Sequence, residues 1–133
     1  MHASRFTSCH NSSVRQLRYI LVVYGISLLF WLSTLAYRTY TDREIDRLNK
    51  PLFTMQCDGW CALHFVSYTA MGFLAPSYWH VLIAVGFLFE LVELGLARVS
   101  KYVKYDLVGD TLTNAGGIVL GVFLRNVLAR SAV

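Results

Sequence analysis

The chain has 133 residues, which is room for one domain; 56% of them are hydrophobic and only 15% are charged. Together with a mean hydropathy of +0.48, this composition excludes an ordinary soluble domain and indicates an integral membrane protein. The formal net charge is +4, but no array of base-stacking aromatic residues accompanies the basic residues, so we expect no nucleic-acid partner.

Four apolar segments predict an all-α fold, namely a polytopic membrane protein with a bundle of about four transmembrane helices. The segments are residues 19–37, about 60–74, 79–96 and 107–124. A spanning helix needs roughly 20 residues, so the second segment is short. A soluble helical domain, the alternative, would need polar outer faces that residues 19–37 do not offer.

These segments divide the chain into five parts. We predict a basic N-terminal flank (1–18), a first membrane anchor helix (19–37), a charged connector (38–59), a three-helix core (60–124) and a C-terminal tail (125–133). The flank has Arg, Ser and Thr but no acid, as mitochondrial transit peptides do, although we favour a plain basic flank before a membrane anchor. Lys and Arg number five on the side of the two chain ends and seven in the first and third loops, which does not decide the orientation.

Each of the last three predicted helices carries one face of polar or small residues at helical spacing. These are Cys61, His64, Tyr68 and Gly72 in the first of them, Gly86, Glu90, Glu93 and Ala97 in the second, and Asp106, Asp110, Asn114, Gly117 and Gly121 in the third. A carboxylate at the centre of a membrane helix costs about 2.5 to 3.5 kcal/mol, so we expect these faces to pack against one another. The glycines would allow a close approach of the helices.

The carboxylates of these faces suggest a metal site. Glu90 and Glu93 would repel each other in an apolar span and therefore need a partner. Hard oxygen ligands suit Ca²⁺ or Mg²⁺, and the predicted ligands are Glu90, Glu93, Asp106, Asp110 and Asn114. The candidate catalytic residues are His64, as general base or as cationic counterpart of Glu90, together with Tyr68 and Glu90. Asp106 has an alternative role as the N-cap of the last helix.

The three cysteines, Cys9, Cys57 and Cys61, do not make a disulfide framework. Cys57 and Cys61 could share a helix face and either pair or bind a soft metal. No second Cys or His pair stands at ligand spacing, so we expect both to be buried or interfacial thiols.

Three segments together resemble the VanZ-like membrane family: HFVSYTAMG from His64 to Gly72, FELVE from Phe89 to Glu93, and DLVGDTLTNAGGIVLG from Asp106 to Gly121. The family pattern runs His-Phe-x-x-Tyr, then Glu-x-x-Gln, then Asp-x-x-x-Asn-x-x-Gly-x-x-x-Gly, and the resemblance covers residues 60–124. Glu93 stands where the family has Gln, and the acid and Lys that usually precede the His are absent. FELVEL with the later Asp, Asn and Gly-Gly-Ile is also similar to the core of eukaryotic phosphatidylserine synthases, which are calcium-dependent enzymes that exchange phospholipid headgroups.

Both resemblances imply a polar site inside a small helical bundle. The leading hypothesis is a multi-pass, VanZ-like membrane protein that binds or acts on phospholipid or lipid-linked headgroups with a divalent cation. One alternative is a noncatalytic accessory subunit of a larger membrane assembly, whose partners are lipids and other membrane proteins. The other is a minimal phosphatidylserine synthase-like exchange enzyme. Whether the protein is an enzyme, and in which membrane it lies, stay open.

Overall fold

The computed structural model describes residues 3–43, 47–50 and 57–131, and of residues 3–11 and 47 it describes the backbone alone. Four α-helices make up most of this part: α1 (Ala3–Thr41), α2 (Gly59–Leu74), α3 (Trp79–Ala97) and α4 (Leu107–Ser131). Two short 3₁₀ helices, η1 (Arg47–Asn49) and η2 (Pro76–Tyr78), stand before α2 and α3. The predicted all-α fold is confirmed.

Three stretches are long and apolar enough to cross a membrane, Ser12–Thr41, Pro76–Ala97 and Leu107–Ser131. Most of their apolar side chains face outward, and the buried core is limited to a few residues such as Met71, Leu82 and Ile118. Large outward-facing apolar surfaces are expected where lipid, not water, surrounds the helices. The protein is therefore a multi-pass integral membrane protein.

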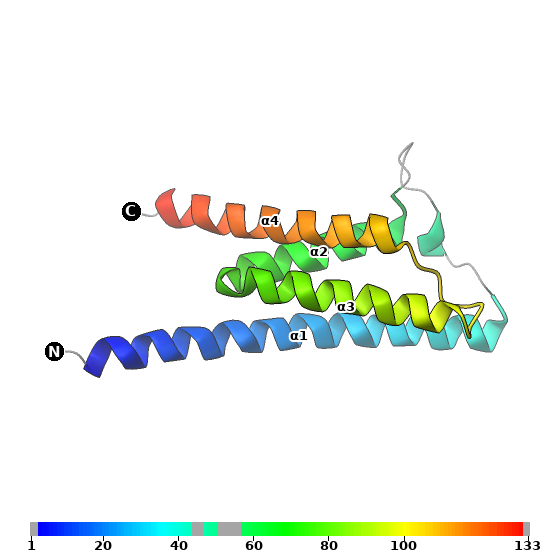
Figure 1. Ribbon diagram of the computed structural model, residues 1–133, viewed down its shortest axis with the longest axis horizontal. Coiled ribbons are helices and arrows are strands. Elements are labelled where there is room, and N and C mark those ends of the chain that lie inside the picture. Colours follow the sequence, from blue (N-terminus) through cyan, green and yellow to red (C-terminus); the bar gives the residue numbers. More distant parts are fainter. Residues whose placement is uncertain (1–2, 44–46, 51–56, 132–133) are drawn as a thin grey trace.

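The four helices lie side by side and alternate in direction along the long axis of the molecule (Figure 1). We call the end where α1 and α3 finish and α2 and α4 begin the loop end. The opposite end, which we call the terminal end, holds residues 3 and 131 and the η2 hairpin between α2 and α3. With 16 residues, α2 is only about 24 Å long, shorter than the roughly 30 Å of a bilayer core.

Glycines hold α2 and α4 together at the centre of the bundle. A Cβ atom on Gly117 would stand 2.7 Å from the backbone oxygen of Phe65, and one on Gly72 would stand 2.5 Å from that of Ile118. A Cβ on Gly121 would collide with the backbone oxygen of Thr69. Because all three obstacles are backbone atoms, this helix pair can form only where the side chain is missing.

Helices α1 and α4 are longer than the apolar segments that predicted them. Hydropathy locates the lipid-facing part of a helix, but a helix continues until a residue stops it. Neither residues 3–18 nor residues 125–131 contain Gly or Pro, and the structure is helical through both. At its other end α1 stops at Asp42, which has a positive φ of 52°, and the Arg43 amide donates a hydrogen bond to the Arg38 carbonyl (3.0 Å). These features form a Schellman-type cap.

Candidate functional site

A cavity of about 320 Å³ opens at the loop end, and all four helices contribute to its walls. α2 begins at Gly59 and contributes Trp60, Cys61 and His64 to the cavity wall, and the loop of residues 98–106 that joins α3 to α4 contributes residues 102–106. The Asp58 carboxylate caps the first turn of α2, accepting hydrogen bonds from the amides of Trp60 (2.9 Å) and Cys61 (3.0 Å).

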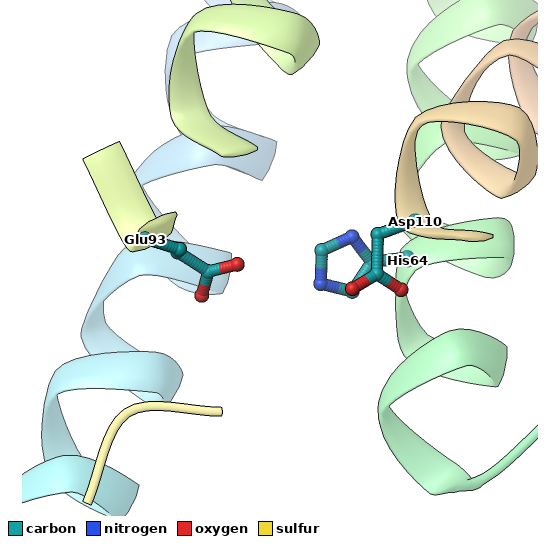
Figure 2. Close-up of side chains that lie close together, drawn as sticks. All are labelled: His64, Glu93 and Asp110. Carbon is teal, nitrogen blue, oxygen red and sulfur yellow. The ribbon is translucent and has the colours of Figure 1, made fainter. Parts of the chain in front are cut away.

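Three predicted site residues come together in this cavity: His64 from α2, Glu93 from α3 and Asp110 from α4. One ligand atom of each lies within 4.8 Å of the others, and Figure 2 shows the three side chains pointing toward one another. Glu93 is 3% exposed, whereas Asp110 and His64 are half-buried. Glu93 stands four residues before the end of α3 and Asp110 three residues after the start of α4, so they lie roughly 6 Å and roughly 4.5 Å inside the helix ends. The cluster is therefore close to the membrane surface.

Behind this cluster lies a buried chain of hydrogen bonds that joins the same three helices. Asn114 on α4 donates from Nδ2 to Oε1 of Glu90 on α3 (2.8 Å), and its Oδ1 lies 3.0 Å from Nδ1 of His64. Because an amide nitrogen only donates, the Asn114 nitrogen faces the Glu90 carboxylate and the Asn114 oxygen faces His64. This oxygen only accepts, so His64 carries a proton on Nδ1. In the neutral imidazole the other ring nitrogen, Nε2, then has a lone pair for a metal ion or a proton.

Glu90 is completely buried beneath the cluster, with 0% exposure. Its Oε1 also lies 3.6 Å from His64 Nδ1, while its Oε2 accepts no hydrogen bond from the part of the chain that the structure describes. An unsatisfied buried polar atom costs about 1 to 3 kcal/mol, so this oxygen is a place where a water molecule, an ion or a proton would be stabilised. Glu90 does not line the cavity itself, and it acts on the cluster through its hydrogen bond to Asn114 and through its direct contacts with His64 and Glu93.

Tyr68, a predicted catalytic residue, lies away from the cavity, in the core. Its hydroxyl is 3.0 Å from that of Tyr24 on α1, and its ring stacks on the His64 ring with 6.5 Å between centroids. Gly86 on α3 leaves the space for that hydroxyl, because a Cβ there would stand 2.9 Å from it. In this position Tyr68 supports the His64 ring and does not face the cavity.

Asp106, predicted as a metal ligand, is not among the His and acidic side chains that cluster in the described residues. Asp106 lines the cavity, but its Oδ1 accepts a hydrogen bond from the Gly109 amide (3.0 Å), which makes it the N-cap of α4. Asn114 bridges His64 and Glu90, as described above. Of the predicted site residues, some therefore line the cavity, and others hold the cavity residues in position from behind.

Sequence reasoning overlooked Arg38, which forms one wall of the cavity. It is 5% exposed, donates to the Tyr102 carbonyl (2.9 Å) and to the Asn49 side-chain oxygen (2.8 Å), and lies over the Trp60 ring at 5.4 Å. These contacts tie α1 to α2, to η1 and to the loop of residues 98–106. The sequence places Arg38 in the last turn of α1, where a basic residue usually only flanks a membrane helix. For that reason the sequence did not identify it as part of a site.

At the outer edge of this loop, Lys101 and Tyr102 both donate to Asp42 Oδ1, at 2.8 and 2.6 Å. The hydrogen bond from Lys101, followed by that from Tyr102, lowers the pKa of the Asp42 carboxyl, and the hydrogen bond to Asp42 together with its negative charge raises the pKa of Lys101. These groups are exposed, so the pair fixes the loop's position more than it adds to stability.

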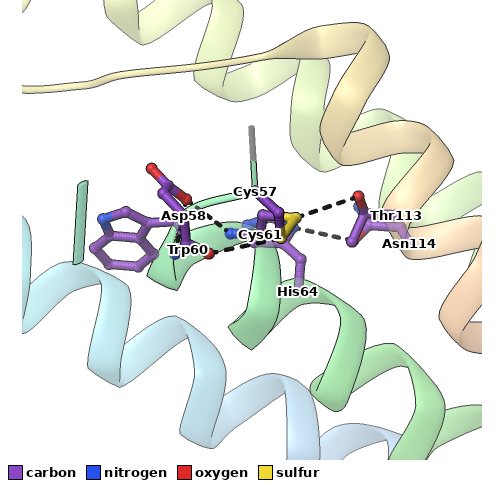
Figure 3. The surroundings of a disulfide bond; sticks show 7 residues. All are labelled: Cys57, Asp58, Trp60, Cys61, His64, Thr113 and Asn114. Atoms are coloured by element: carbon purple, nitrogen blue, oxygen red, sulfur yellow. Dashed lines mark hydrogen bonds between the residues drawn. A yellow bond between two sulfur atoms is a disulfide. The ribbon is translucent and has the colours of Figure 1, made fainter. Parts of the chain in front are cut away.

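The expectation of two free thiols at Cys57 and Cys61 is wrong, because they form a disulfide with 5.4 Å between their Cα atoms (Figure 3). The physical reason is the path of the chain: Cys57 lies two residues before the start of α2 at Gly59 and Cys61 lies in its first turn, which brings the two sulfur atoms within reach of an S–S bond. Both half-cystines line the cavity, and the Cys61 sulfur lies 3.8 Å from the Thr113 hydroxyl on α4.

Comparison with family models, with curated protein sequences and with solved structures finds no match to this chain.

Proposed function

We propose that this protein is a small VanZ-like membrane protein whose loop-end cavity binds a divalent cation and, through it, the phosphate-bearing headgroup of a phospholipid or lipid-linked molecule. The single observation that carries the proposal is the cluster of His64, Glu93 and Asp110, whose ligand atoms lie within 4.8 Å of one another. Three ligands from three helices, two of them acidic, suit a divalent cation better than any neutral ligand.

The donor set influences which cation is favoured. Carboxylate oxygens alone favour Ca²⁺ or Mg²⁺, but an imidazole nitrogen adds affinity for Mn²⁺ and Zn²⁺. The Nδ1 proton of His64 is held by Asn114, which leaves Nε2 as the ligand atom. Buried Glu90, bonded to the same Asn114, supplies negative charge behind the site.

A lipid headgroup fits the location and the charges of the cavity. The cluster lies near the membrane surface, and the cavity of about 320 Å³ is large enough for a phosphate with its substituent. Lys104 and Arg38 line the same cavity as the acids, so cationic and anionic groups are both present, as a zwitterionic or phosphorylated headgroup requires. The VanZ-like motif supports the proposal, since its His, Glu and Asn residues are the ones joined by the buried hydrogen bonds.

Cation binding is tested by calorimetric titration of the purified protein in detergent with Ca²⁺, Mg²⁺, Mn²⁺ and Zn²⁺ separately. We expect saturable one-to-one binding of at least one ion, weakened at least tenfold in Glu93→Gln and in Asp110→Asn. The matched control is Asp42→Asn, which removes a carboxylate at the same end but outside the cavity. Absence of binding for all four ions, or equal weakening in the control, would refute the cation site.

The fate of the lipid is tested by incubating the purified protein with phospholipid in mixed micelles, with and without the bound cation. Headgroup exchange or hydrolysis that disappears in His64→Ala would show an enzyme, with His64 Nε2 as the proton acceptor. Cation-dependent lipid retention without turnover would show a binding protein. If the protein neither binds nor converts lipid but copurifies with fixed membrane partners, the accessory-subunit alternative replaces this proposal.

A further inference from the structure

The disulfide carries information about which side of the membrane the cavity faces. Disulfides persist in oxidising compartments such as the periplasm, the endoplasmic reticulum lumen or the cell exterior, and are rare where thiols are kept reduced. Cys57 and Cys61 lie at the loop end, and both line the cavity. Residues 3 and 131 lie at the opposite end of the bundle (Figure 1).

The charges at the terminal end agree with this orientation, although the count of Lys and Arg along the sequence, five against seven, does not decide it. The sequence has no Asp or Glu before Asp42 and none after Asp110, and the acids that the structure describes all lie in the loop-end half. At the terminal end α1 carries Arg15 and Arg18, and α4 carries Arg125 and Arg130. Basic segments without acids are attracted to the anionic cytoplasmic leaflet by about 1 kcal/mol for each residue.

We propose that the cavity opens to the oxidising side of the membrane, with residues 3 and 131 on the reducing side, and that it takes its ligand from the leaflet on the oxidising side. The orientation stands on the disulfide, whereas the statement about the ligand rests on the function proposed above. If that function holds, the substrates are headgroups of the extracytoplasmic or lumenal leaflet.

The test uses cysteine labelling in right-side-out and inverted vesicles, prepared from the cytoplasmic membrane of bacteria that express the protein. Two variants are made in a Cys9→Ser background, Tyr40→Cys at the loop end, where Tyr40 is 91% exposed, and Ser131→Cys at the terminal end. We expect a membrane-impermeant maleimide to label Tyr40→Cys only in right-side-out vesicles and Ser131→Cys only in inverted ones. The opposite pattern would overturn the orientation.

The disulfide itself is checked in the same membranes. In the Cys9→Ser protein we expect no labelling before reduction and addition of two maleimides, seen by mass, after reduction. Labelling of two thiols without reduction would remove the first support for the proposal. None of these measurements involves cation or lipid binding, so the orientation can hold while the proposed function fails, and the reverse.

A different observation points to a second lipid site, at the terminal end. A cavity of about 250 Å³ lies between α1, α4 and the hairpin, with Arg15 and Arg125 among its lining residues. None of the described residues that line it is acidic, and Ser12 and Tyr19 add hydroxyl groups. The Ser77 amide donates to the Gln16 side chain (3.3 Å), which holds α1 against the hairpin and so maintains the cavity wall.

We infer that this cavity binds the phosphate of an anionic phospholipid, with Arg15 and Arg125 as the two cationic contacts. Arginine pairs bind phosphate oxygens well, and this cavity lies where spans begin and end, at the depth of lipid headgroups. Apolar Leu74 beside the arginines suits the first carbons of an acyl chain. A free phosphate ion would gain nothing from that contact.

Native mass spectrometry of the detergent-purified protein with added phosphatidylglycerol or phosphatidylcholine tests this site. We expect preferential retention of one phosphatidylglycerol, weakened about fivefold for each arginine replaced in Arg15→Gln and Arg125→Gln. The matched control is Arg18→Gln with Arg130→Gln, which removes the same charge from residues that do not line the cavity. Equal loss in both pairs, no lipid preference, or full displacement by inorganic phosphate would overturn the inference.

Discussion

Replacing Gly116 and Gly117 of α4 one at a time by alanine should show which of the two is needed for the packing of α4 on α2. Gly117 faces α2, where a new Cβ would stand 2.7 Å from the Phe65 oxygen and 3.1 Å from the Thr69 nitrogen. The nearest atom to a Cβ on Gly116 is Cε2 of the Phe65 ring at 3.9 Å, an ordinary contact. The two substitutions thus differ in sterics but not in chemistry.

The magnitude follows from two opposing effects. Alanine in place of glycine favours a helix by about 1 kcal/mol, and this gain is common to both variants. Overpacking costs typically about 1 to 3 kcal/mol, and here it cannot be relieved by a rotamer change, because the atoms in contact with Gly117 are mainly backbone. We therefore expect Gly117→Ala to be less stable than Gly116→Ala by about 1 to 3 kcal/mol.

The assay is reversible unfolding in mixed detergent micelles, followed by the fluorescence of the chain's three tryptophans. Separation of α2 from α4 would also lengthen the 3.0 Å contact between His64 and Asn114, so cation affinity should fall in Gly117→Ala and stay unchanged in Gly116→Ala. If Gly117→Ala proves at least as stable as Gly116→Ala, the close packing of α2 on α4 is wrong.

Three further expectations concern single contacts. Asn114→Ala breaks the buried hydrogen-bond bridge and should cost about 1 to 3 kcal/mol in the same unfolding assay, whereas exposed Asn126→Ala should change stability by less than about 0.5 kcal/mol. Glycine adopts a positive φ without the strain that Asp42 has at the end of α1, so Asp42→Gly should raise the free energy of unfolding by up to about 1 kcal/mol. A clear loss of stability would mean that the contacts of the Asp42 side chain with Lys101 and Tyr102 outweigh the backbone strain. Because the pKa of Asp42 is lowered in the folded protein, its small contribution should be complete above the ordinary Asp pKa of about 4 and disappear as the pH falls through the lowered value. Asp42→Asn should abolish that part of the acid dependence of unfolding, and an unchanged profile would show that the pair adds nothing.

The sequence by itself determined the fold class and the approximate positions of the helices, since the need to match an apolar helix to a bilayer is a local property of composition and length. It also indicated which faces of the last three helices would avoid lipid, because helical periodicity places His64, Glu90 and Asn114 on particular sides of their own helices.

Only the tertiary structure decided which polar side chains of those faces line the cavity and which are buried behind it. Whether a carboxylate lines a cavity or lies behind one depends on the offset of neighbouring helices, which no single helix encodes; thus Glu93 and Asp110 reach the cavity while Glu90 stays beneath it. The end of α1 similarly brings Arg38 to a loop sixty-four residues later. The disulfide was within reach of sequence reasoning, because the spacing of Cys57 and Cys61 permits it, but the choice between thiols and a bond depends on the start of α2 at Gly59. The local sequence determined where the helices form, and the offset of the four helices along the bundle axis determined which residues meet at the cavity.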